Sequence, residues 1–191
     1  MRIIRDKKNM AHEIETKVLD IDVEDIKKKL EELGAEKLQD MRLSVDWYRP
    51  KGCKDGEEDW YLRIRTHKSG RYECTWKGKS EHLGVSRRHK EINFLIDEQE
   101  HLADLFEELD LEKYAFQEKD RTSYSYENWQ FDIDQYPGMP AFFEIEGNSE
   151  EHIKEGMKLL GCVNNRTWND GEKTLINRVY NLDWNKMKFS M

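Results

Sequence analysis

Two short segments near opposite ends of the chain alternate charged and apolar residues with a period of two. They are Glu13-Ile14-Glu15-Thr16-Lys17 and Phe142-Phe143-Glu144-Ile145-Glu146. Successive side chains of a β-strand point to opposite faces, so each segment is expected to present its charged groups on one face only. Carboxylates that face each other repel, and they need protons, basic neighbours or a cation between them. The pattern therefore indicates a site for a hard metal ion.

The same alternation recurs between these two segments. Strands are expected at about 12–20, 43–49, 61–66, 72–77, 87–96, 114–121, 122–127, 129–135 and 141–147. Helices are expected after Asp22, Asp97 and Ser149, with a final amphipathic helix around 172–182. The opposite strand faces are largely apolar. The polar residues expected on one shared face are Glu13, Glu15, Lys17, Arg63, Arg65, Glu73, Lys77, His89, Glu91, Lys119, Arg121, Asp132, Asp134, Glu144 and Glu146.

Eight or nine mostly antiparallel strands with few helices indicate an α+β fold, mainly antiparallel β, in the form of a closed barrel or a sandwich. Helices can pack on the apolar faces, so the polar faces turn inward if the sheet closes. On any one strand such alternation is most often a solvated face, with ion pairs worth under about 1 kcal/mol each. Seven strands with the same pattern favour a water-filled channel lined by charges of both signs.

Length and composition limit the class of protein. The 191 residues suffice for one domain, expected at 12–182, between a polar N-terminal extension at 1–11 and a C-terminal tail at 183–191. The net charge of −8 argues against general nucleic-acid binding but allows a small polyanionic ligand held by local basic groups. The three cysteines are widely spaced, which favours reduced thiols, and no apolar run approaches the roughly 20 residues that span a bilayer. We expect a cytoplasmic protein, monomeric or homodimeric, with neither nucleic-acid nor membrane partners.

Basic and acidic groups on one inward face suit phosphoryl-transfer chemistry. Arginine donates two parallel hydrogen bonds to a phosphate, whereas carboxylates suit Mg²⁺ or Mn²⁺. Such an ion offsets charge on the leaving group and orients a nucleophile.

Five segments follow one another in a characteristic order. They are Glu13-x-Glu15-x-Lys17, LRIR at 62–65, TWKG at 75–78, KDRTSY at 119–124, and DQYPGMPAFFEIEG at 134–147. This ordered set resembles the CYTH superfamily, also called triphosphate tunnel metalloenzymes, over about residues 12–180. That family includes class IV adenylate cyclases, thiamine triphosphatases and inorganic triphosphatases.

The resemblance implies an eight-stranded closed β-barrel, the triphosphate tunnel, with peripheral helices. It also implies a small-molecule triphosphate substrate and a Mg²⁺ or Mn²⁺ cofactor. The implied phosphate-binding residues are Lys17, Arg63, Arg65, Lys77, Lys119 and Arg121. The implied metal-binding residues are Glu13, Glu15, Glu91, Asp134, Glu144 and Glu146. Among these, Glu15, Glu146 and Lys17 are the expected catalytic residues, with a carboxylate such as Glu15 or Glu146 orienting the attacking water.

One segment departs from the family pattern. Where the family usually has R-x-E-x-E, this chain has His89-Lys90-Glu91-Ile92-Asn93. Glu91 fits the central acid, but His89 and Asn93 are not carried over as site residues. The six histidines form no spacing suited to zinc, and a solvated or supporting role is favoured over ligation for His89. Arg87, Arg88 and Lys90 could supply charge here, but the sequence does not settle which way they face.

Three functions fit the expected channel. The leading hypothesis is a metal-dependent triphosphatase. The first alternative is a class IV adenylate cyclase that converts ATP to cyclic AMP and pyrophosphate, which requires a purine pocket that no residue pattern establishes. The second alternative is a non-catalytic protein that binds polyphosphate or nucleotides.

Overall fold

Two long antiparallel strands form the centre of the sheet. In the computed structural model, which describes residues 12–54 and 57–190, β2 (Glu36–Pro50) pairs with β8 (Leu111–Tyr126) along nearly its whole length. β8 takes the place of the two successive strands expected at 114–121 and 122–127. The extension expected at residues 1–11 lies outside the described residues.

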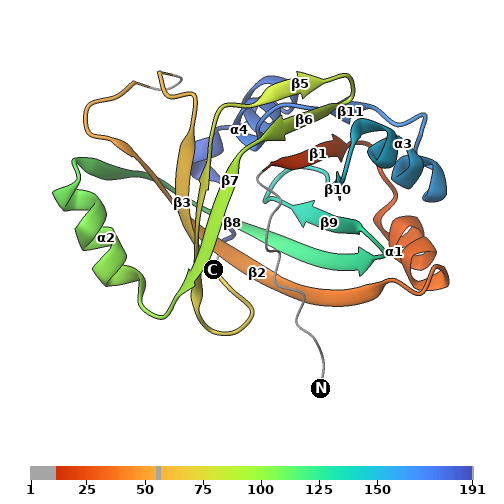
Figure 1. Ribbon diagram of the computed structural model, residues 1–191, viewed down its shortest axis with the longest axis horizontal. Helices are drawn as coiled ribbons and strands as arrows, with labels where there is room; N and C mark the ends of the chain where they lie inside the picture. The colour runs from red at the N-terminus through yellow and green to blue at the C-terminus, as the bar shows by residue number, and fades with distance from the viewer. Residues whose placement is uncertain (1–11, 55–56, 191) are drawn as a thin grey trace.

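Shorter strands continue the sheet on both sides of this central pair (Figure 1). They are β1 (Glu13–Val18), β3 (Tyr61–Thr66), β4 (Tyr72–Lys77), β5 (Glu81–Leu83), β6 (Ser86–His89), β7 (Glu91–Ile96), β9 (Trp129–Gln135), β10 (Phe142–Gly147) and β11 (Thr167–Trp168). The hydrogen-bonded order is β5-β6-β1-β10-β9-β8-β2-β3-β4-β7, with β11 paired to β1. Every pairing among the described strands is antiparallel. The fold is therefore α+β and mainly antiparallel, as expected.

The expected closed barrel of eight strands is not confirmed. The sheet contains eleven described strands, and its hydrogen-bonded path ends at β5 on one side and at β7 on the other. The physical reason lies at Lys90, where the strand expected at 87–96 divides in two. Before this residue β6 pairs with β1, and after it β7 pairs with β4. One chain segment thus links the two regions of the sheet, although no ladder joins β6 to β7.

Three longer helices form where they are expected, and two of them begin at a capping side chain. The helix expected from Asp97 begins instead after Glu98, which makes no side-chain cap hydrogen bond. α1 (Val23–Glu32) begins at Asp22, whose carboxylate accepts hydrogen bonds from the amides of Glu24 and Asp25 at 3.0 and 3.1 Å. α3 (Glu150–Leu159) begins at Ser149 in the same way, with the His152 amide as donor. α2 (Gln99–Glu108) packs Phe106 edge-on against Tyr48. These helices cover apolar faces of the strands, with α1 and α3 beside β1 and β10 in Figure 1.

The C-terminal region is less regular than the single helix expected at 172–182. It forms a short helix α4 (Glu172–Thr174), a π-helical turn η1 (Leu175–Val179) and a 3₁₀ turn η2 (Trp184–Lys186). Trp184 is only 2% exposed, and the amide of Glu118 in β8 donates to the carbonyl oxygen of Met187 at 2.8 Å. The residues expected to form a tail at 183–191 therefore pack on the sheet as far as the structure describes them.

The apolar core lies partly outside and partly inside the curved sheet. Outside, Phe131, Phe143 and Ile145 pack against the helices through Ile153 and Met157. Inside, one end of the sheet is filled by a cluster that includes Leu43, Val45, Trp47, Phe142, Leu175, Ile176 and Trp184. The interior is thus apolar at one end, which leaves the remainder for the charged residues.

None of the helices in the described ranges combines the length and the apolar character that a membrane-spanning helix requires.

Candidate active site

The register of the sheet places the charged residues on one face. Residues directly opposite each other in an antiparallel ladder share a face. Glu15 lies opposite both Glu146 and Arg87, and Lys17 lies opposite Glu144. The same face continues through the pairs Glu144–Asp132, Arg121–Asp134, Arg65–Glu73, Lys77–Glu91 and Glu13–His89. The strand pleat therefore places the expected residues on one face of the sheet.

This face encloses a cavity of about 550 Å³. Three further residues of the expected set, Lys17, Lys119 and Asp134, share the face but do not line the cavity, and each is at most 1% exposed. These three lie behind the cavity wall. The expected residues that line the cavity are Glu13, Glu15, Arg63, Arg65, Lys77, Glu91, Arg121, Glu144 and Glu146.

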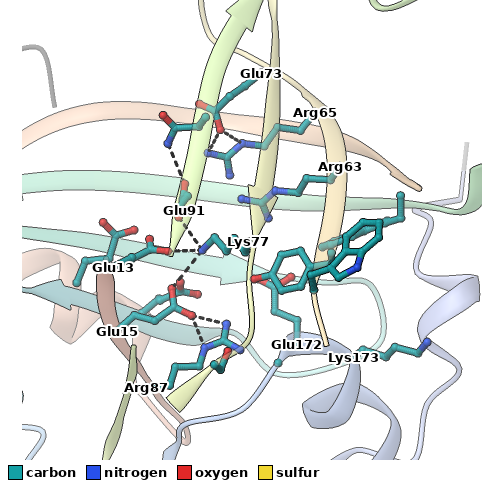
Figure 2. Close-up of a pocket in the computed structure, with 18 of the residues that line it drawn as sticks. Glu13, Glu15, Arg63, Arg65, Glu73, Lys77, Arg87, Glu91, Glu172 and Lys173 are labelled. Carbon is teal, nitrogen blue, oxygen red and sulfur yellow. Dashed lines mark hydrogen bonds and ion pairs between the residues drawn. The ribbon is translucent and has the colours of Figure 1, made fainter. Parts of the chain in front are cut away.

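Lys77 joins the two regions of the sheet across the cavity (Figure 2). Its ammonium group contacts the Glu13 carboxylate and lies 3.1 Å from Glu91 Oε2 and 3.7 Å from Glu15 Oε2. Five strands separate β1 from β4 along the hydrogen-bonded path, so this contact requires the sheet to curl back on itself. Burial opposes the charge on Lys77, but Glu13 and Glu15 outweigh it and raise the pKa of the lysine well above its usual value.

Glu15 is fully buried and lies near three cations, Arg87, Lys17 and Lys77. Arg87 Nε donates to Glu15 Oε1 at 2.6 Å, and Lys17 Nζ lies 3.3 Å from the same oxygen. Burial alone would raise the pKa of Glu15, but Arg87 and Lys17 outweigh burial and hold this pKa well below its usual value. Glu15 Oε2 is buried and has no hydrogen-bond partner in the part of the chain that the structure describes.

Glu144 has the opposite electrostatic environment. Its carboxylate lies 3.6 Å from Lys17 and 3.9 Å from Arg121, which are weaker contacts than those of Glu15. Burial, followed by repulsion from Glu15, raises the pKa of Glu144 to about 8. The pKa values of these two neighbouring carboxylates therefore shift in opposite directions. Glu15 keeps its charge, while Glu144 holds a proton near neutral pH.

A second buried network extends from the cavity wall to residues behind it. Arg121 donates to Asp132 and Asp134, with Nη1–Oδ2 and Nε–Oδ1 distances of 2.6 Å each. Lys119 donates to Asp134 at 2.8 Å and to Glu172 at 2.6 Å. Glu172 comes from α4, beyond the last long strand, and also accepts a hydrogen bond from the Tyr136 hydroxyl at 2.6 Å. The C-terminal region thus contributes a carboxylate to the charged interior.

Arg63 differs from every other basic residue of the set. It is only 7% exposed and lines the cavity, but no carboxylate of the described residues lies within 4.0 Å of its guanidinium. Its Nε has no hydrogen-bond partner among those residues either. The side chain lies near the ring of Trp47, with 5.7 Å between the guanidinium carbon and the ring centroid. Burial opposes the charge, but Tyr61, Glu172, Glu91 and Glu73 outweigh burial and raise the pKa of Arg63 above its usual value. None of these carboxylates makes a direct ion pair with the guanidinium, so its hydrogen-bond donors can bind an anion from outside the chain.

The donor set fits a hard divalent cation. Oxygens of Glu13, Glu15 and Glu146 lie within 4.8 Å of one another, as do oxygens of Asp134, Glu144 and Glu172. The unpartnered Oε2 atoms of Glu15 and Glu144 add available ligand atoms to these groups. Carboxylate oxygens are the ligands that Mg²⁺ and Mn²⁺ prefer. The acidic residues of the cavity could therefore hold such an ion.

Aromatic side chains line another part of the cavity wall. They are Trp47, Trp60, Tyr61, Tyr114 and Trp184. The ring centroids are 5.5 Å apart for Trp47 and Tyr61 and 5.3 Å apart for Trp47 and Trp184. Lys173 lies over the Trp184 ring at 5.1 Å. The charged region is thus bounded by a surface suited to an apolar or planar group.

Sequence reasoning did not assign three residues that the structure places here. Arg87 alternates with His89 and Glu91, so it belongs to the same alternating pattern. The change of strand at Lys90 nevertheless left the direction of the Arg87 side chain undetermined. Glu172 and Lys173 line the cavity from a region without strand periodicity. No spacing signal in the sequence distinguishes those two residues from surface charges.

Solved structures with the same fold come from several organisms. The PH1012 protein of Pyrococcus horikoshii OT3 is 24% identical, with a TM-score of 0.63 over 78% of this chain and 90% of that chain. A protein of Vibrio parahaemolyticus described as a candidate adenylate cyclase is 13% identical, with a TM-score of 0.72 over 86% and 97%. HpAC1 from Hippeastrum, described as having a dominant triphosphatase activity, is 15% identical, with a TM-score of 0.63 over 91% and 97%. At these identities the likeness establishes the fold.

No curated protein sequence matches the chain. The sequence profile of the CYTH domain, in contrast, matches residues 11–166, which is most of the chain and includes nearly all of the charged strands described above. The ordered motifs, the sheet register and this match agree, and the chain belongs to the CYTH domain family.

Proposed function

We propose that this protein is a divalent-metal-dependent triphosphatase whose substrate binds in the charged cavity. The observation that carries the proposal is Arg63, a buried guanidinium that lines the cavity without a carboxylate partner in the described chain. Lys17, Lys77, Arg87, Lys119 and Arg121 each have such a partner within 4.0 Å. An anionic ligand would give Arg63 a direct partner, and a phosphate chain offers further oxygens to the other basic residues that line the cavity.

The basic residues hold the phosphates and offset their charge. Arg63 and Arg65 project from β3, and Lys77 projects from the neighbouring strand β4. Arg121 reaches the cavity from β8. Planar guanidinium groups bind phosphate oxygens through paired hydrogen bonds, and they stabilise charge that develops on those oxygens in the transition state.

The carboxylates of β1 and β10 position the metal and the attacking water. Glu13, Glu15 and Glu146, with Glu91, Asp134 and Glu144 nearby, would hold Mg²⁺ or Mn²⁺. When bound, such an ion neutralises phosphate charge and activates the leaving group. Glu15 keeps its charge in the buried site because Arg87 and Lys17 lower its pKa. Glu15 or Glu146 then accepts a hydrogen bond from the water that attacks the terminal phosphorus, while Lys17 offsets the charge of Glu15.

The ion pairs within the cavity couple the binding of the triphosphate to the binding of the metal. Lys77 now neutralises Glu13, Glu15 and Glu91. When a phosphate chain takes over Lys77, these carboxylates lose their internal cation and gain affinity for an external one. Metal and triphosphate are therefore expected to strengthen each other's binding.

A nucleotide cyclase is the second candidate, and the aromatic residues of the cavity wall support it. The half-buried rings of Trp60, Tyr61 and Tyr114 offer a surface on which a nucleobase could lie. In that reaction the ribose 3′-hydroxyl attacks the α-phosphorus of ATP and pyrophosphate leaves. The structural neighbours point to both chemistries, because the Vibrio protein is described as a candidate cyclase and HpAC1 as a triphosphatase.

One incubation series separates these activities. Purified protein is mixed with tripolyphosphate, thiamine triphosphate or ATP, each with Mg²⁺ or Mn²⁺. The proposal predicts release of orthophosphate that depends on the metal. Cyclic AMP with pyrophosphate would establish the cyclase instead. Binding of tripolyphosphate without turnover would identify a non-catalytic polyphosphate-binding protein and contradict both enzymatic candidates.

A further inference from the structure

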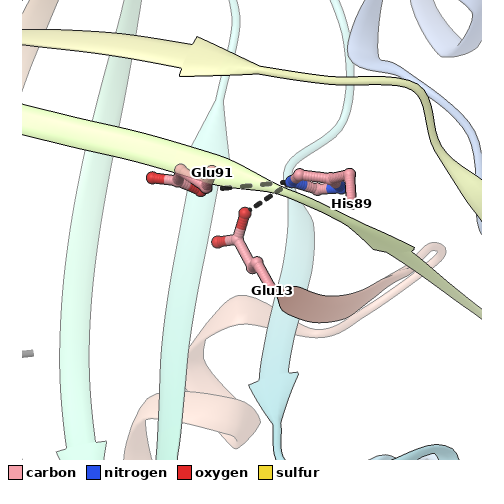
Figure 3. A group of neighbouring side chains, drawn as sticks. All are labelled: Glu13, His89 and Glu91. Atoms are coloured by element: carbon pink, nitrogen blue, oxygen red, sulfur yellow. Dashed lines mark hydrogen bonds and ion pairs between the residues drawn. The ribbon is translucent and has the colours of Figure 1, made fainter. Parts of the chain in front are cut away.

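A histidine lies among the carboxylates at the end of β6. Figure 3 shows Glu13, His89 and Glu91 converging, and their ligand atoms lie within 4.8 Å of one another. His89 Nε2 is 2.7 Å from Glu13 Oε2 and 4.0 Å from Glu91 Oε2. The imidazole is 2% exposed, so solvent does not account for its position. Of the three groups of potential metal ligands in the described chain, this one alone contains nitrogen.

We propose that Glu13, His89 and Glu91 form a mixed nitrogen–oxygen site that binds a divalent transition-metal ion, Mn²⁺, Co²⁺ or Zn²⁺, in preference to Mg²⁺. Imidazole nitrogen is a good ligand for these ions, whereas Mg²⁺ strongly favours oxygen. This inference rests on the proposed function and adds the identity of one bound ion. Because ion binding can be measured without turnover, the inference and the proposed function can be contradicted independently.

The position of Lys77 shows that this site already attracts a cation. Its ammonium group contacts Glu13 and lies 3.1 Å from Glu91 Oε2. It also lies 3.7 Å from Glu15 Oε2, which belongs to a fully buried side chain and accepts no hydrogen bond from the described residues. Because this buried oxygen lies near the ammonium group and accepts no hydrogen bond from the described residues, it is available as a ligand for an ion.

The geometry suits replacement of the ammonium group by a metal ion. Adjacent ligands of an ion bound at about 2.1 Å are separated by roughly 3 Å in octahedral coordination. His89 Nε2 lies 2.7 Å from Glu13 Oε2 and 4.0 Å from Glu91 Oε2, one distance below and one above this separation. Lys77 lines the cavity of about 550 Å³, so its side chain has space to turn toward a bound phosphate when an ion takes its place.

The imidazole can present the required bare nitrogen. A ligating histidine binds through a ring nitrogen that carries no proton, and its other nitrogen then carries the proton. His89 Nδ1 is buried and has no hydrogen-bond partner among the described residues. In the ion-free protein Nε2 donates to the Glu13 carboxylate, so the ring proton lies on Nε2 and must move to the unpartnered Nδ1 before Nε2 can bind an ion. With the proton on Nδ1, Nε2 would be available as a ligand beside the carboxylates of Glu13 and Glu91.

The test measures ion binding without substrate. Co²⁺ is titrated into the full-length protein and followed by its visible absorption, alone and in competition with Mg²⁺. His89→Gln should weaken Co²⁺ binding by about tenfold or more and change Mg²⁺ binding by less than about threefold. His101→Gln is the matched control, since His101 Nδ1 also contacts a carboxylate, Glu98, at 2.9 Å but lies on the exposed surface of α2. That variant should bind both ions as the wild-type protein does.

A second measurement uses only the wild-type protein, in case His89→Gln fails to fold. Pulsed electron paramagnetic resonance of the Mn²⁺-loaded protein should show coupling to an imidazole ¹⁴N nucleus. An oxygen-only spectrum would overturn the proposal. So would equal losses of Co²⁺ and Mg²⁺ affinity in His89→Gln, or unchanged Co²⁺ affinity. If the wild-type protein binds Co²⁺ through His89 but hydrolyses no triphosphate, the proposed function is contradicted and this inference still stands.

Discussion

Arg87 and Glu15 form a buried ion pair between neighbouring strands, with an Nε–Oε1 distance of 2.6 Å. Arg87 is 5% exposed and Glu15 is fully buried. The pair connects β6 to β1 at the base of the cavity, beside the ligands proposed for the metal. Because Arg87 outweighs the effect of burial on the pKa of Glu15, it keeps a site carboxylate charged.

Removal of this arginine should destabilise the protein. Arg87→Met leaves the Glu15 carboxylate buried with weaker compensation, so the free energy of unfolding should fall by about 3 kcal/mol. Glu15→Gln added to Arg87→Met should restore most of that loss, because the uncompensated charge is gone. Denaturant unfolding at pH 7 measures both effects. A double variant no more stable than Arg87→Met would contradict this account of the pair.

Arg63 and Arg65 should respond differently to the same substitution. Arg63→Gln removes a buried charge that makes no ion pair within 4.0 Å in the described chain, so stability should stay nearly constant. Arg65→Gln breaks an ion pair with Glu73, whose Nη2–Oε1 distance is 2.7 Å, and should cost about 1 kcal/mol. Thermal unfolding without ligand compares the two variants. Equal destabilisation would mean that Arg63 has a structural partner after all.

Much of the site follows from strand periodicity alone. The alternation in Glu13, Glu15 and Lys17 correctly predicts one shared face, because the pleat fixes the direction of each side chain. The same holds for Arg63 and Arg65 and for Glu144 and Glu146, which the register brings to that face. Local patterns of this kind do not depend on how the sheet curls.

Other features depend on tertiary structure and were not accessible. The change of partner at Lys90, where β6 ends and β7 begins, depends on which strands lie nearby. The position of Glu172 depends on how the C-terminal region packs into the interior. Trp184, in the region expected to be a tail, packs against Trp47 because the inner face of β2 is apolar at that end. Periodicity carries no information about such long-range contacts.

Loss of a single carboxylate should alter the metal dependence of activity. Glu13→Gln removes one negative oxygen from two groups of potential ligands, so the Mg²⁺ concentration for half-maximal activity should rise by about tenfold. Glu73→Gln is a suitable control, since Glu73 also lines the cavity but pairs with Arg65 and belongs to none of those groups. Activity measured over a range of Mg²⁺ concentrations tests this. A shift of the same size in both variants would remove Glu13 from the metal site.

The proton on Glu144 should make stability depend on pH. The usual pKa of glutamate is about 4.5, and in the folded protein burial and Glu15 raise that of Glu144 to about 8. Between these values the folded state holds a proton that the unfolded state has lost, so the stability contributed by Glu144 falls as pH rises. The slope is about 1.4 kcal/mol per pH unit at most, and the contribution is fully lost above pH 8.

Comparison with Glu144→Gln isolates this contribution, because the variant keeps the other titrating groups. Unfolding is measured without metal at pH 5, 6, 7, 8 and 9. The stability of the wild-type protein relative to Glu144→Gln should decrease from pH 5 to 8 and then level off. A difference that stays constant or increases with pH would show that Glu144 is charged at neutral pH.

The most direct test of the central claim is calorimetric titration of tripolyphosphate into the protein with Mg²⁺ present, at a temperature where turnover is negligible. The cavity should bind one tripolyphosphate, and Arg63→Gln should weaken that binding by about tenfold or more, because a charged hydrogen-bonding partner of the phosphate is lost. Arg42→Gln, which breaks a surface ion pair with Asp120, provides the matched control and should bind normally. Absence of binding to the wild-type protein, or equal affinity in Arg63→Gln, would contradict a triphosphate site in this cavity.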